Sequence, residues 1–352
     1  MSGMHVCHVI TRLIVGGAQE NTLLTCEGLH ARGHEVTLLT GPAEGPEGDL
    51  LGRARAGGYR VEIVPELCRA IHPLRDRAAY RRLRRRLAEL APDVMHSHSS
   101  KAGILARKAA AEVRRRGHGA APPASGSDAG PAGRSPRAWA AAPEGTRPDA
   151  PEDPPAARNA RAWAPGGMAI VHTIHGLPFH RYERWWRNRL YIALERRAGR
   201  RSDAIISVAD AMTAQALAAG VGRPEQYATI YSGMEVERFL ARPPEADAFR
   251  ASLRLPPGAV LVAQVSRLAE LKGHEYLLAA AERVADERVH YCLVGDGRRR
   301  QWIESEIGRR GLAKRFRLTG LLPPAEMPAV LHATDVLVHC SLREGLARAL
   351  PQ

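Results

Sequence analysis

The chain has 352 residues, enough to bury two hydrophobic cores, and its 51 Lys and Arg against 37 Asp and Glu give a formal net charge of +14. No apolar run approaches the roughly 20 residues that span a bilayer, and the N-terminal MSGMHVCHVI lacks the charged flank and apolar core of a signal peptide. We therefore expect a cytoplasmic protein. The basic balance suits anionic partners, but no base-stacking module accompanies it, so we predict no nucleic-acid partner.

Short β-branched runs alternate with helical stretches through the first third of the chain. We predict strands from the runs HVCHVI (5–10), EVTLLT (35–40), VEIV (61–64) and DVMHSH (93–98). An apolar stripe predicts a helix over 18–32, which ends at Gly33. Strands and helices in this alternation imply βαβ units and a mostly parallel sheet.

The alternation stops at residues 117–167 and then resumes. This stretch is rich in Pro, Ala and Gly and has no apolar period, so it cannot bury enough surface to offset the entropy of ordering. We predict a disordered insertion there. Strands follow at 168–176, 203–208 and 227–233, and residues 234–257, which contain PP twice, have the composition of an interdomain linker.

A second alternation follows the linker, with strands predicted at 259–266, 289–297 and 335–340 and helices between them. The predicted fold class is therefore α/β, with two doubly wound, Rossmann-like domains that face a crevice. The N-terminal domain comprises residues 1–116 and 168–233, and the C-terminal domain comprises residues 258–352.

Glycines and histidines follow the strands of the first domain. Gly16 and Gly17 stand just before a helix N-terminus, where backbone N–H groups favour an anion and the missing Cβ lets a ligand approach. A tight turn that needs a positive φ is the alternative, and the sequence does not separate the two. The HxxH pair that ends at His175 has no carboxylate or cysteine beside it to complete a metal set, so we predict a neutral imidazole that hydrogen-bonds a substrate hydroxyl. His96 and His98, on the preceding strand, fit ordinary polar strand ends.

Two cations open the second domain. Arg267 ends a strand and Lys272 stands just before a helix, an arrangement that suits a phosphate or diphosphate and can stabilise it as a leaving group without metal. The turn VGDG (294–297), with Gly295 and Gly297, suits the close passage of a nucleotide.

The segment RYERWWRNRLYIALERRAGRR (181–201) mixes aromatic and cationic residues. Its Trp185, Trp186, Arg187 and Arg189 suit an interfacial helix on an anionic membrane surface. The same helix can equally pack its apolar face into the first domain, and the sequence leaves both interpretations open.

In this order and spacing, the motifs VGGAQENT, HTIHG, SRLAELKG, VGDG and SLREGL resemble those of glycosyltransferase family 4, which has the GT-B fold. The resemblance covers nearly the whole chain outside the insertion. It implies a retaining hexosyltransferase that moves a hexosyl unit from a nucleotide-diphosphate sugar to a cell-surface glycan or lipid-linked acceptor. It also implies that no cofactor or catalytic metal is needed, and that the protein works peripherally at the inner face of the plasma membrane.

The resemblance also implies roles for individual residues. His175 matches the histidine beside the transferred sugar, with a catalytic role. Gly17 matches the glycine that lets a loop approach the donor diphosphate and the acceptor. Arg267 and Lys272 match the pair that neutralises the donor diphosphate.

The last residues match the family motif E-x7-E in part. Glu344 matches its first glutamate, which hydrogen-bonds hydroxyls of the donor sugar, so the resemblance implies a catalytic and a donor-binding role for it. The position of the second glutamate carries Gln352, whose amide can still hydrogen-bond a ribose of the donor. Because the chain stops there, we expect the second domain to be incomplete, the chain to be a fragment, and its activity to be impaired. The alternative is a non-catalytic relative that binds a membrane or a partner through its basic first domain.

Overall fold

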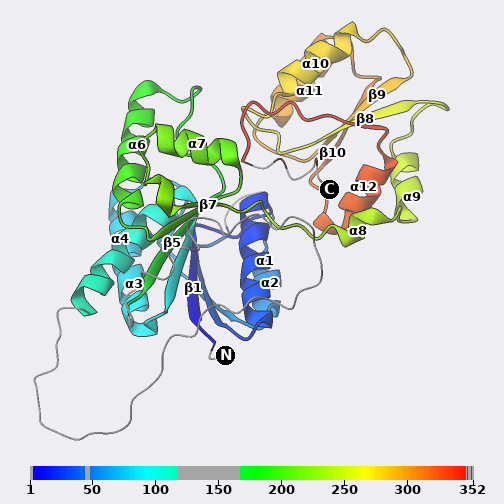
Figure 1. Ribbon diagram of the computed structural model, residues 1–352. Helices are drawn as coiled ribbons and strands as arrows, with labels where there is room; N and C mark the ends of the chain where they lie inside the picture. The colour runs from blue at the N-terminus through cyan, green and yellow to red at the C-terminus, as the bar shows by residue number, and fades with distance from the viewer. Residues whose placement is uncertain (1–2, 44–47, 118–166, 346, 348–349, 351–352) are drawn as a thin grey trace, which may run out of the picture.

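The structure is a computed structural model that describes residues 3–43, 48–117, 167–345, 347 and 350. Nearly all of the insertion predicted at 117–167 lies outside the described residues, and so does Gln352. The described chain forms two lobes, each built on a parallel β-sheet with helices packed on it (Figure 1). This arrangement is the GT-B fold, with two Rossmann-like domains, and the fold-class prediction is confirmed.

Seven parallel strands form the sheet of the N-terminal lobe, in the order β3-β2-β1-β4-β5-β6-β7. Most positions of its central strands are buried, as expected for parallel strands covered on both faces. The strand order reverses between β1 and β4, and a crevice opens at the carboxyl ends of strands at such a point. The strands are β1 (His5–Ile10), β2 (Glu35–Thr40), β3 (Arg60–Ile63), β4 (Val94–His98), β5 (Ala169–Ile174), β6 (Ala204–Ser207) and β7 (Tyr227–Thr229).

Helices cover both faces of this sheet. Because successive side chains of a strand point to opposite faces, each face has its own hydrophobic core. Val9 of β1 packs in the core that includes Leu83 and Leu87 of α3, whereas its neighbour Ile10 packs with Leu23 of α1 on the other face. α3 lies against α4, and α4 against α6. The helices are α1 (Gly17–Ala31), α2 (Leu51–Ala56), α3 (Pro73–Leu90), α4 (Ser100–Gly117), α6 (Trp185–Gly199), α7 (Asp210–Ala218) and the short 3-10 helix η2 (Pro224–Gln226).

The C-terminal lobe has four parallel strands in the order β10-β9-β8-β11, so its strand order reverses between β8 and β11. Its strands are β8 (Val260–Val265), β9 (Val289–Val294), β10 (Phe316–Gly320) and β11 (Val336–Leu337). Its helices are α9 (Glu245–Ser252), α10 (His274–Arg283), α11 (Arg300–Arg309), the short 3-10 helix η3 (Pro324–Glu326) and α12 (Met327–Ala333), and the short helix α8 (Glu237–Leu240) precedes them.

One sequence pattern sets the start of strand pairing in both lobes. Asp93, Asp203 and Asp335 each stand one residue before a strand, in the sequences PDV, SDA and TDV. Their carboxylates accept hydrogen bonds from backbone N–H groups at the starts of the neighbouring strands β1 (2.8 Å), β5 (2.8 Å) and β8 (2.7 Å). Each aspartate thus accepts a hydrogen bond from a backbone N–H group that has no partner in the β-sheet, and it fixes where the pairing of two strands begins.

The predicted strands are present, and several of them are shorter than expected, most of all β7 and β11. β7 ends at Thr229 and β11 at Leu337, whereas the predicted runs extended to 233 and 340. Residues 234–257, predicted as a linker, contain α8 and α9, and α9 packs against α12 of the C-terminal lobe. Arg250 on α9 donates a hydrogen bond to the backbone oxygen of Ala333 at the end of α12 (2.7 Å).

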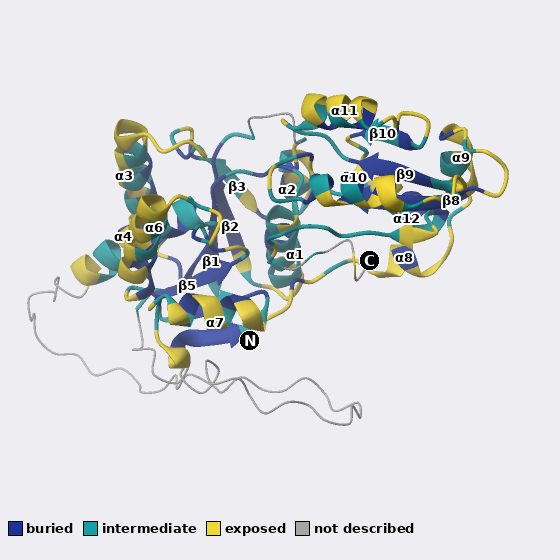
Figure 2. Ribbon diagram, turned by 90° about the horizontal axis from the view of Figure 1, so that it is seen from above, coloured by how far each residue is buried: buried dark blue, intermediate teal, exposed yellow. Residues whose placement is uncertain are grey.

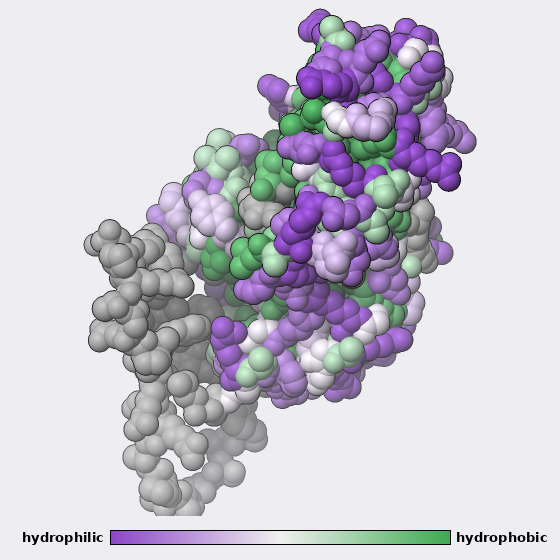
Figure 3. All heavy atoms as spheres, turned by 90° about the vertical axis from the view of Figure 1, so that its right-hand side faces the viewer, coloured by the Kyte–Doolittle hydropathy of each residue, from purple (hydrophilic) through white to green (hydrophobic). Residues whose placement is uncertain are grey.

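Buried strands and exposed helix faces separate clearly in Figure 2, where the sheets are mainly dark blue and the outer helix faces yellow. The face seen in Figure 3 is mainly hydrophilic, in keeping with the many charged residues of the sequence. Within the described ranges, no helix combines the length and the apolar character that a membrane span requires.

Candidate active site

A cleft of about 710 Å³ lies between the two lobes, and both contribute to its wall. The N-terminal lobe supplies segments that follow β1, β4 and β5, and the C-terminal lobe supplies the turns after β8 and β9. Both sets come from carboxyl ends of parallel strands, where ligands bind in open α/β sheets. The cleft brings together six of the residues predicted from separate motifs: Gly17, His175, Arg267, Lys272, Gly295 and Glu344.

Lys272 and Glu344 form an ion pair on the C-terminal side of the cleft. His339 Nε2 lies 3.5 Å from the same carboxylate, and Arg267 lines the wall of the cleft as well. α10 begins directly after this loop, with Gly273 as its N-cap, so its N-terminus adds partial positive charge. The predicted diphosphate-binding lysine and the predicted sugar-binding carboxylate are therefore in direct contact.

A backbone contact at Gly273 explains how these distant segments meet. Gly273 has φ +72°, and a Cβ at this position would lie 2.0 Å from the backbone oxygen of Cys340. The backbone N–H of Leu342 donates to the oxygen of Leu271 (2.9 Å). The loop before α10 and the segment after β11 therefore run against each other, which places Lys272 beside Glu344.

Gly345 brings the C-terminal lobe into contact with His175. A Cβ at Gly345 would lie 2.3 Å from the backbone oxygen of His175 and 2.9 Å from Cε of Met212, so the space admits only glycine without a shift. This contact fixes where Glu344, which lines the cleft from the C-terminal lobe, lies relative to His175, which lines it from the N-terminal lobe.

The turn after β9 separates the two glycines predicted for donor binding. Gly295 lines the cleft, and a Cβ there would lie 2.1 Å from the backbone oxygen of Ser266. A Cβ at Gly297 would lie 2.4 Å from the backbone oxygen of Leu268, and Gly297 is not among the described residues that line the cleft. Asp296, between them, does line it. Gly297 therefore shapes the turn, and Gly295 faces the cleft.

The glycine pair after β1 does not form a left-handed turn at its first position. Gly16 has an extended backbone (φ 172°, ψ 155°), which any residue can adopt, and Gly17 is the first residue of α1. Both line the cleft. The alternative of a positive-φ turn is thereby excluded at Gly16. The approach of a ligand to the N-terminus of α1 stays a prediction.

His175 is the last member of a row of histidines that leads from the core to the cleft. His98 Nδ1 lies 3.1 Å from His175 Nε2, and His98 Nε2 lies 3.0 Å from His8 Nδ1. Burial lowers the pKa of His8 to about 4. Burial, with the neighbouring imidazoles, also holds the pKa of His98 well below its ordinary value, so both rings are neutral at pH 7.

His96 and His98, which we predicted to be ordinary polar strand ends, are buried in this cluster. His8, His96 and His98 can each offer a ligand atom within 4.8 Å of the others, a spacing that could hold a metal ion. His96 Nε2 is hydrogen-bonded to Thr173 Oγ1 (2.7 Å), and no carboxylate belongs to the group in the described part of the chain. Because both ring nitrogens of His98 contact neighbouring imidazoles and His96 Nε2 contacts Thr173, we interpret the cluster as a hydrogen-bonded network.

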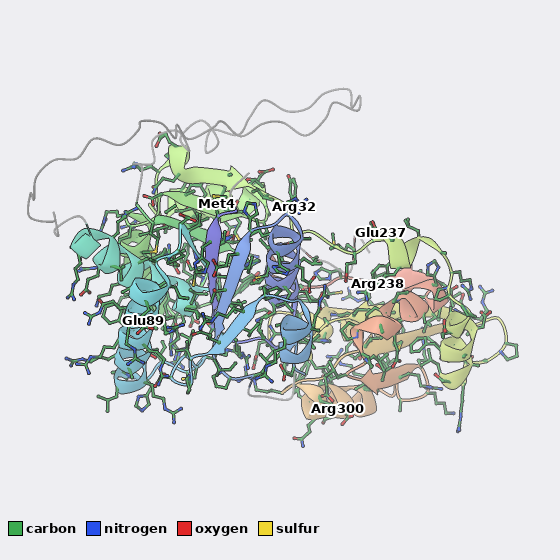
Figure 4. All side chains as sticks on the ribbon, turned by 90° about the horizontal axis from the view of Figure 1, so that it is seen from below. Met4, Arg32, Glu89, Glu237, Arg238 and Arg300 are labelled. Atoms are coloured by element: carbon green, nitrogen blue, oxygen red, sulfur yellow. The ribbon has the colours of Figure 1, made fainter. Side chains whose placement is uncertain are left out.

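The N-terminal wall of the cleft carries cationic side chains that we did not predict from the sequence. Arg12, Arg69 and Lys101 line the cleft from segments that follow β1, β3 and β4. Lys101 Nζ also pairs with Asp76 (2.6 Å). Arg238 of α8 lines the cleft from the segment that joins the lobes, as Figure 4 shows. The position of Arg12 and Lys101 directly after the two strands at the reversal of strand order was a signal that could have identified them.

The aromatic and cationic residues of α6 lie outside the cleft and face solvent. Trp185 is 72% exposed and Trp186 is 46% exposed, and Arg187 and Arg189 are exposed as well. The Arg187 guanidinium lies 5.3 Å from the centroid of the Trp186 ring. Tyr191 of the same helix packs into the lobe, so α6 buries part of its apolar surface and leaves the tryptophans outside.

Family models match both lobes of the chain. The model described as Glycosyltransferase Family 4 matches residues 15–121 and 115–238, more than half of the chain. The chain belongs to glycosyltransferase family 4. A second model, described as Glycosyl transferases group 1, matches residues 245–351 of this family 4 chain.

Among curated proteins, the family 4 chain is similar to a 2-deoxystreptamine glucosyltransferase of Streptomyces kanamyceticus, with 34% identity over 161 residues. That match covers 45% of the chain and 41% of the relative, so it spans less than half of the relative's length. The chain is also 23% identical, over 354 aligned residues, to a UDP-Gal:alpha-D-GlcNAc-diphosphoundecaprenol alpha-1,3-galactosyltransferase of Escherichia coli, covering 99% of the chain and 76% of that protein.

Among solved structures, the chain resembles Anabaena HepE in complex with UDP and glucose, with a TM-score of 0.69 and 18% identity. The superposition covers 98% of this chain and 76% of HepE. At this identity the likeness establishes the fold, which agrees with the two-lobed arrangement described above.

Proposed function

We propose that this family 4 chain is a retaining hexosyltransferase that moves a hexosyl unit from a nucleotide-diphosphate sugar to a lipid-linked or other cell-surface glycan acceptor. The observation that supports this proposal most directly is the cleft, which is lined by His175, Arg267, Lys272 and Glu344. The names of the HepE complexes, with UDP and glucose and with UDP-glucose, support a uridine diphosphate sugar as donor. The retaining course rests on the family resemblance.

The donor half of the site has the charges that a departing diphosphate needs. Arg267, Lys272 and the N-terminus of α10 supply positive charge at one wall, so the proposed transfer needs no catalytic metal. On donor binding, Lys272 would exchange its contact with Glu344 for the diphosphate. The Glu344 carboxylate would then accept hydrogen bonds from the sugar hydroxyls.

The acceptor half favours a negatively charged acceptor. Arg12, Arg69 and Lys101 line the N-terminal wall, with Glu20 as the acidic side chain among its described lining residues, and Lys101 also pairs with Asp76, which does not line the cleft. An amine-bearing acceptor, such as the deoxystreptamine in one relative's name, would meet like charge there. The diphosphoundecaprenol acceptor in the name of the E. coli relative carries the complementary charge, which supports a lipid-linked acceptor.

The donor assignment is tested by measuring sugar transfer and UDP release on the purified chain with UDP-hexoses and polyprenyl-diphosphate sugars. The Arg267→Ala, Lys272→Ala double variant should lose at least about 100-fold in kcat/KM, because each charge-assisted hydrogen bond contributes about 1.5–3 kcal/mol. Transfer should persist in EDTA, and proton NMR of the product should show the donor's anomeric configuration.

The control exchanges two cations of the same types outside the cleft. The Arg283→Ala, Lys314→Ala variant changes exposed residues of the same lobe and should transfer sugar at the wild-type rate. Wild-type turnover in the Arg267→Ala, Lys272→Ala variant would refute the site assignment. A chain that binds vesicles but neither binds nor turns over any nucleotide sugar would support the non-catalytic alternative instead.

The exposed face of α6 supports a peripheral location at the inner face of the plasma membrane. Trp185, Trp186, Leu190 and the surrounding arginines combine apolar side chains with positive charge, as an interfacial helix requires. The Trp185→Ala, Trp186→Ala variant should bind vesicles with 30% phosphatidylserine more weakly than the wild type by about 10-fold or more. Equal binding by the two proteins would refute this membrane surface.

A further inference from the structure

The three rings of His8, His98 and His175 form one continuous hydrogen-bonded row across strands β1 and β4 and the end of β5. The contacts are His8 Nδ1 to His98 Nε2 (3.0 Å) and His98 Nδ1 to His175 Nε2 (3.1 Å). His8 is 0% and His98 1% exposed, whereas His175 lines the cleft. The family resemblance assigns a role to His175 alone, and nothing in it accounts for the two rings behind.

A neutral imidazole carries one proton, so the two hydrogen bonds of the row must run in the same direction. In one direction His8 donates to His98, and His98 donates to His175 Nε2, which puts the proton of His175 on Nδ1. In the other direction His175 donates inward, and the last proton sits on His8 Nε2. That atom is buried and has no hydrogen-bond partner among the described residues.

Buried donors without a partner are the rarest unsatisfied groups in proteins, which favours the first direction. We infer that His98, backed by His8, is a positioning residue that holds the His175 ring with its proton on Nδ1 and its Nε2 occupied. Given the proposed sugar transfer, His175 then meets the donor sugar as a hydrogen-bond donor of fixed orientation. His98 acts through His175 and does not touch the substrate.

The surroundings of the row keep it neutral and in place. His96 Nε2 is bonded to Thr173, and His172 Nδ1 lies 3.0 Å from both the hydroxyl and the backbone oxygen of Ser97, so neither ring interrupts the row. Burial lowers the pKa of His8, and burial together with the neighbouring imidazoles lowers the pKa of His98. A positive charge on either of these two buried rings is therefore disfavoured.

The direct test is the tautomer of His175, read by ¹⁵N NMR of the full chain labelled at histidine ring nitrogens. The His175→Gln variant identifies the His175 signals by their loss. We expect a protonated Nδ1 and a bare Nε2 in His175 at pH 7.5. A protonated Nε2 would overturn the inference, and so would one equivalent of tightly bound zinc in the purified chain, because His98 would then be a ligand.

Two variants of His98 separate positioning from packing. The His98→Asn amide lies near the position of Nδ1 and can still reach His175, whereas the His98→Gln amide lies near the position of Nε2 and can still reach His8. We expect His98→Gln to lower kcat by about 10- to 100-fold with little change in donor KM, because a misplacement near 1 Å costs up to about 100-fold. His98→Asn should stay within a few-fold of the wild type.

The control is His96→Gln, which keeps its contact to Thr173 and should leave kcat unchanged. Equal losses in His98→Asn and His98→Gln would show a packing role and overturn the inference. Because the NMR measurement needs no turnover, a chain that transfers no sugar but shows the Nδ1 proton refutes the proposed function and leaves the inference about the ring in place.

Discussion

The contact between Gly345 and His175 allows a rate loss to be predicted from a distance. In the Gly345→Ala variant, the new Cβ would lie 2.3 Å from the His175 backbone oxygen, whereas real Cβ atoms essentially never approach within 3.0 Å. The two segments must therefore separate by at least about 0.7 Å, which moves Glu344 away from His175. A displacement of this order costs about 10- to 100-fold in kcat when it separates groups that act on one substrate.

The assay compares transfer kinetics and thermal unfolding of Gly345→Ala with those of Gly308→Ala. A Cβ at Gly308, within α11, meets no atom within 4 Å, so that variant should keep full activity and gain about 0.5–1 kcal/mol of stability. Gly345→Ala should unfold at nearly the wild-type temperature, because the contact lies at the surface between lobes. Wild-type kcat in Gly345→Ala would refute the view that this contact sets the geometry of the site.

Three further predictions concern stability. Gly273→Ala should lower the free energy of unfolding of the C-terminal lobe by more than about 1 kcal/mol, because alanine must adopt φ +72° and its Cβ would meet the Cys340 oxygen at 2.0 Å; an unchanged denaturant midpoint would contradict this. Glu195→Gln leaves the fully buried Arg107 without its charge partner at 2.7 Å and should cost about 3–5 kcal/mol by urea unfolding, whereas a loss under 1 kcal/mol would be inconsistent with a buried pair. Below pH 6.5 the unfolded chain protonates His8, whereas the folded chain does so only near pH 4. The free energy of unfolding should therefore fall as pH falls through this window, by about 1.4 kcal/mol per pH unit for each such histidine; a urea midpoint that stays constant from pH 7 to 5 would exclude this.

Most strands and the site motifs could be predicted because they depend on local patterns. β-branched runs of strand length mark β1 and β8, and the strand–loop–helix context of Lys272 predicts a loop suited to anions, which the structure places in the cleft. The contact of Lys272 with Glu344 could not be predicted, because it depends on the backbone approach of Gly273 to Cys340. Such a fit between two loops leaves no periodic trace in the sequence.

The sequence contains enough information to predict the histidine row, but we predicted only its member at the cleft, His175. His96 and His98 were assessed on their own strand, where polar residues at a strand end are common. In a doubly wound sheet, however, the first, fourth and fifth strands are neighbours, and the register places His8 opposite His96. Reading the three strands side by side would have brought His8, His98 and His175 together.

The ion pair of Lys272 with Glu344 also bears on which anions the resting protein can reject. Free phosphate or pyrophosphate offers charge to Lys272 but gives Glu344 nothing in exchange for the partner that it loses. A sugar nucleotide offers both, diphosphate oxygens to the lysine and hydroxyls to the carboxylate. Under the proposed function, Glu344 would compete with small anions for Lys272, whereas the complete donor would give the displaced carboxylate hydroxyl partners in exchange.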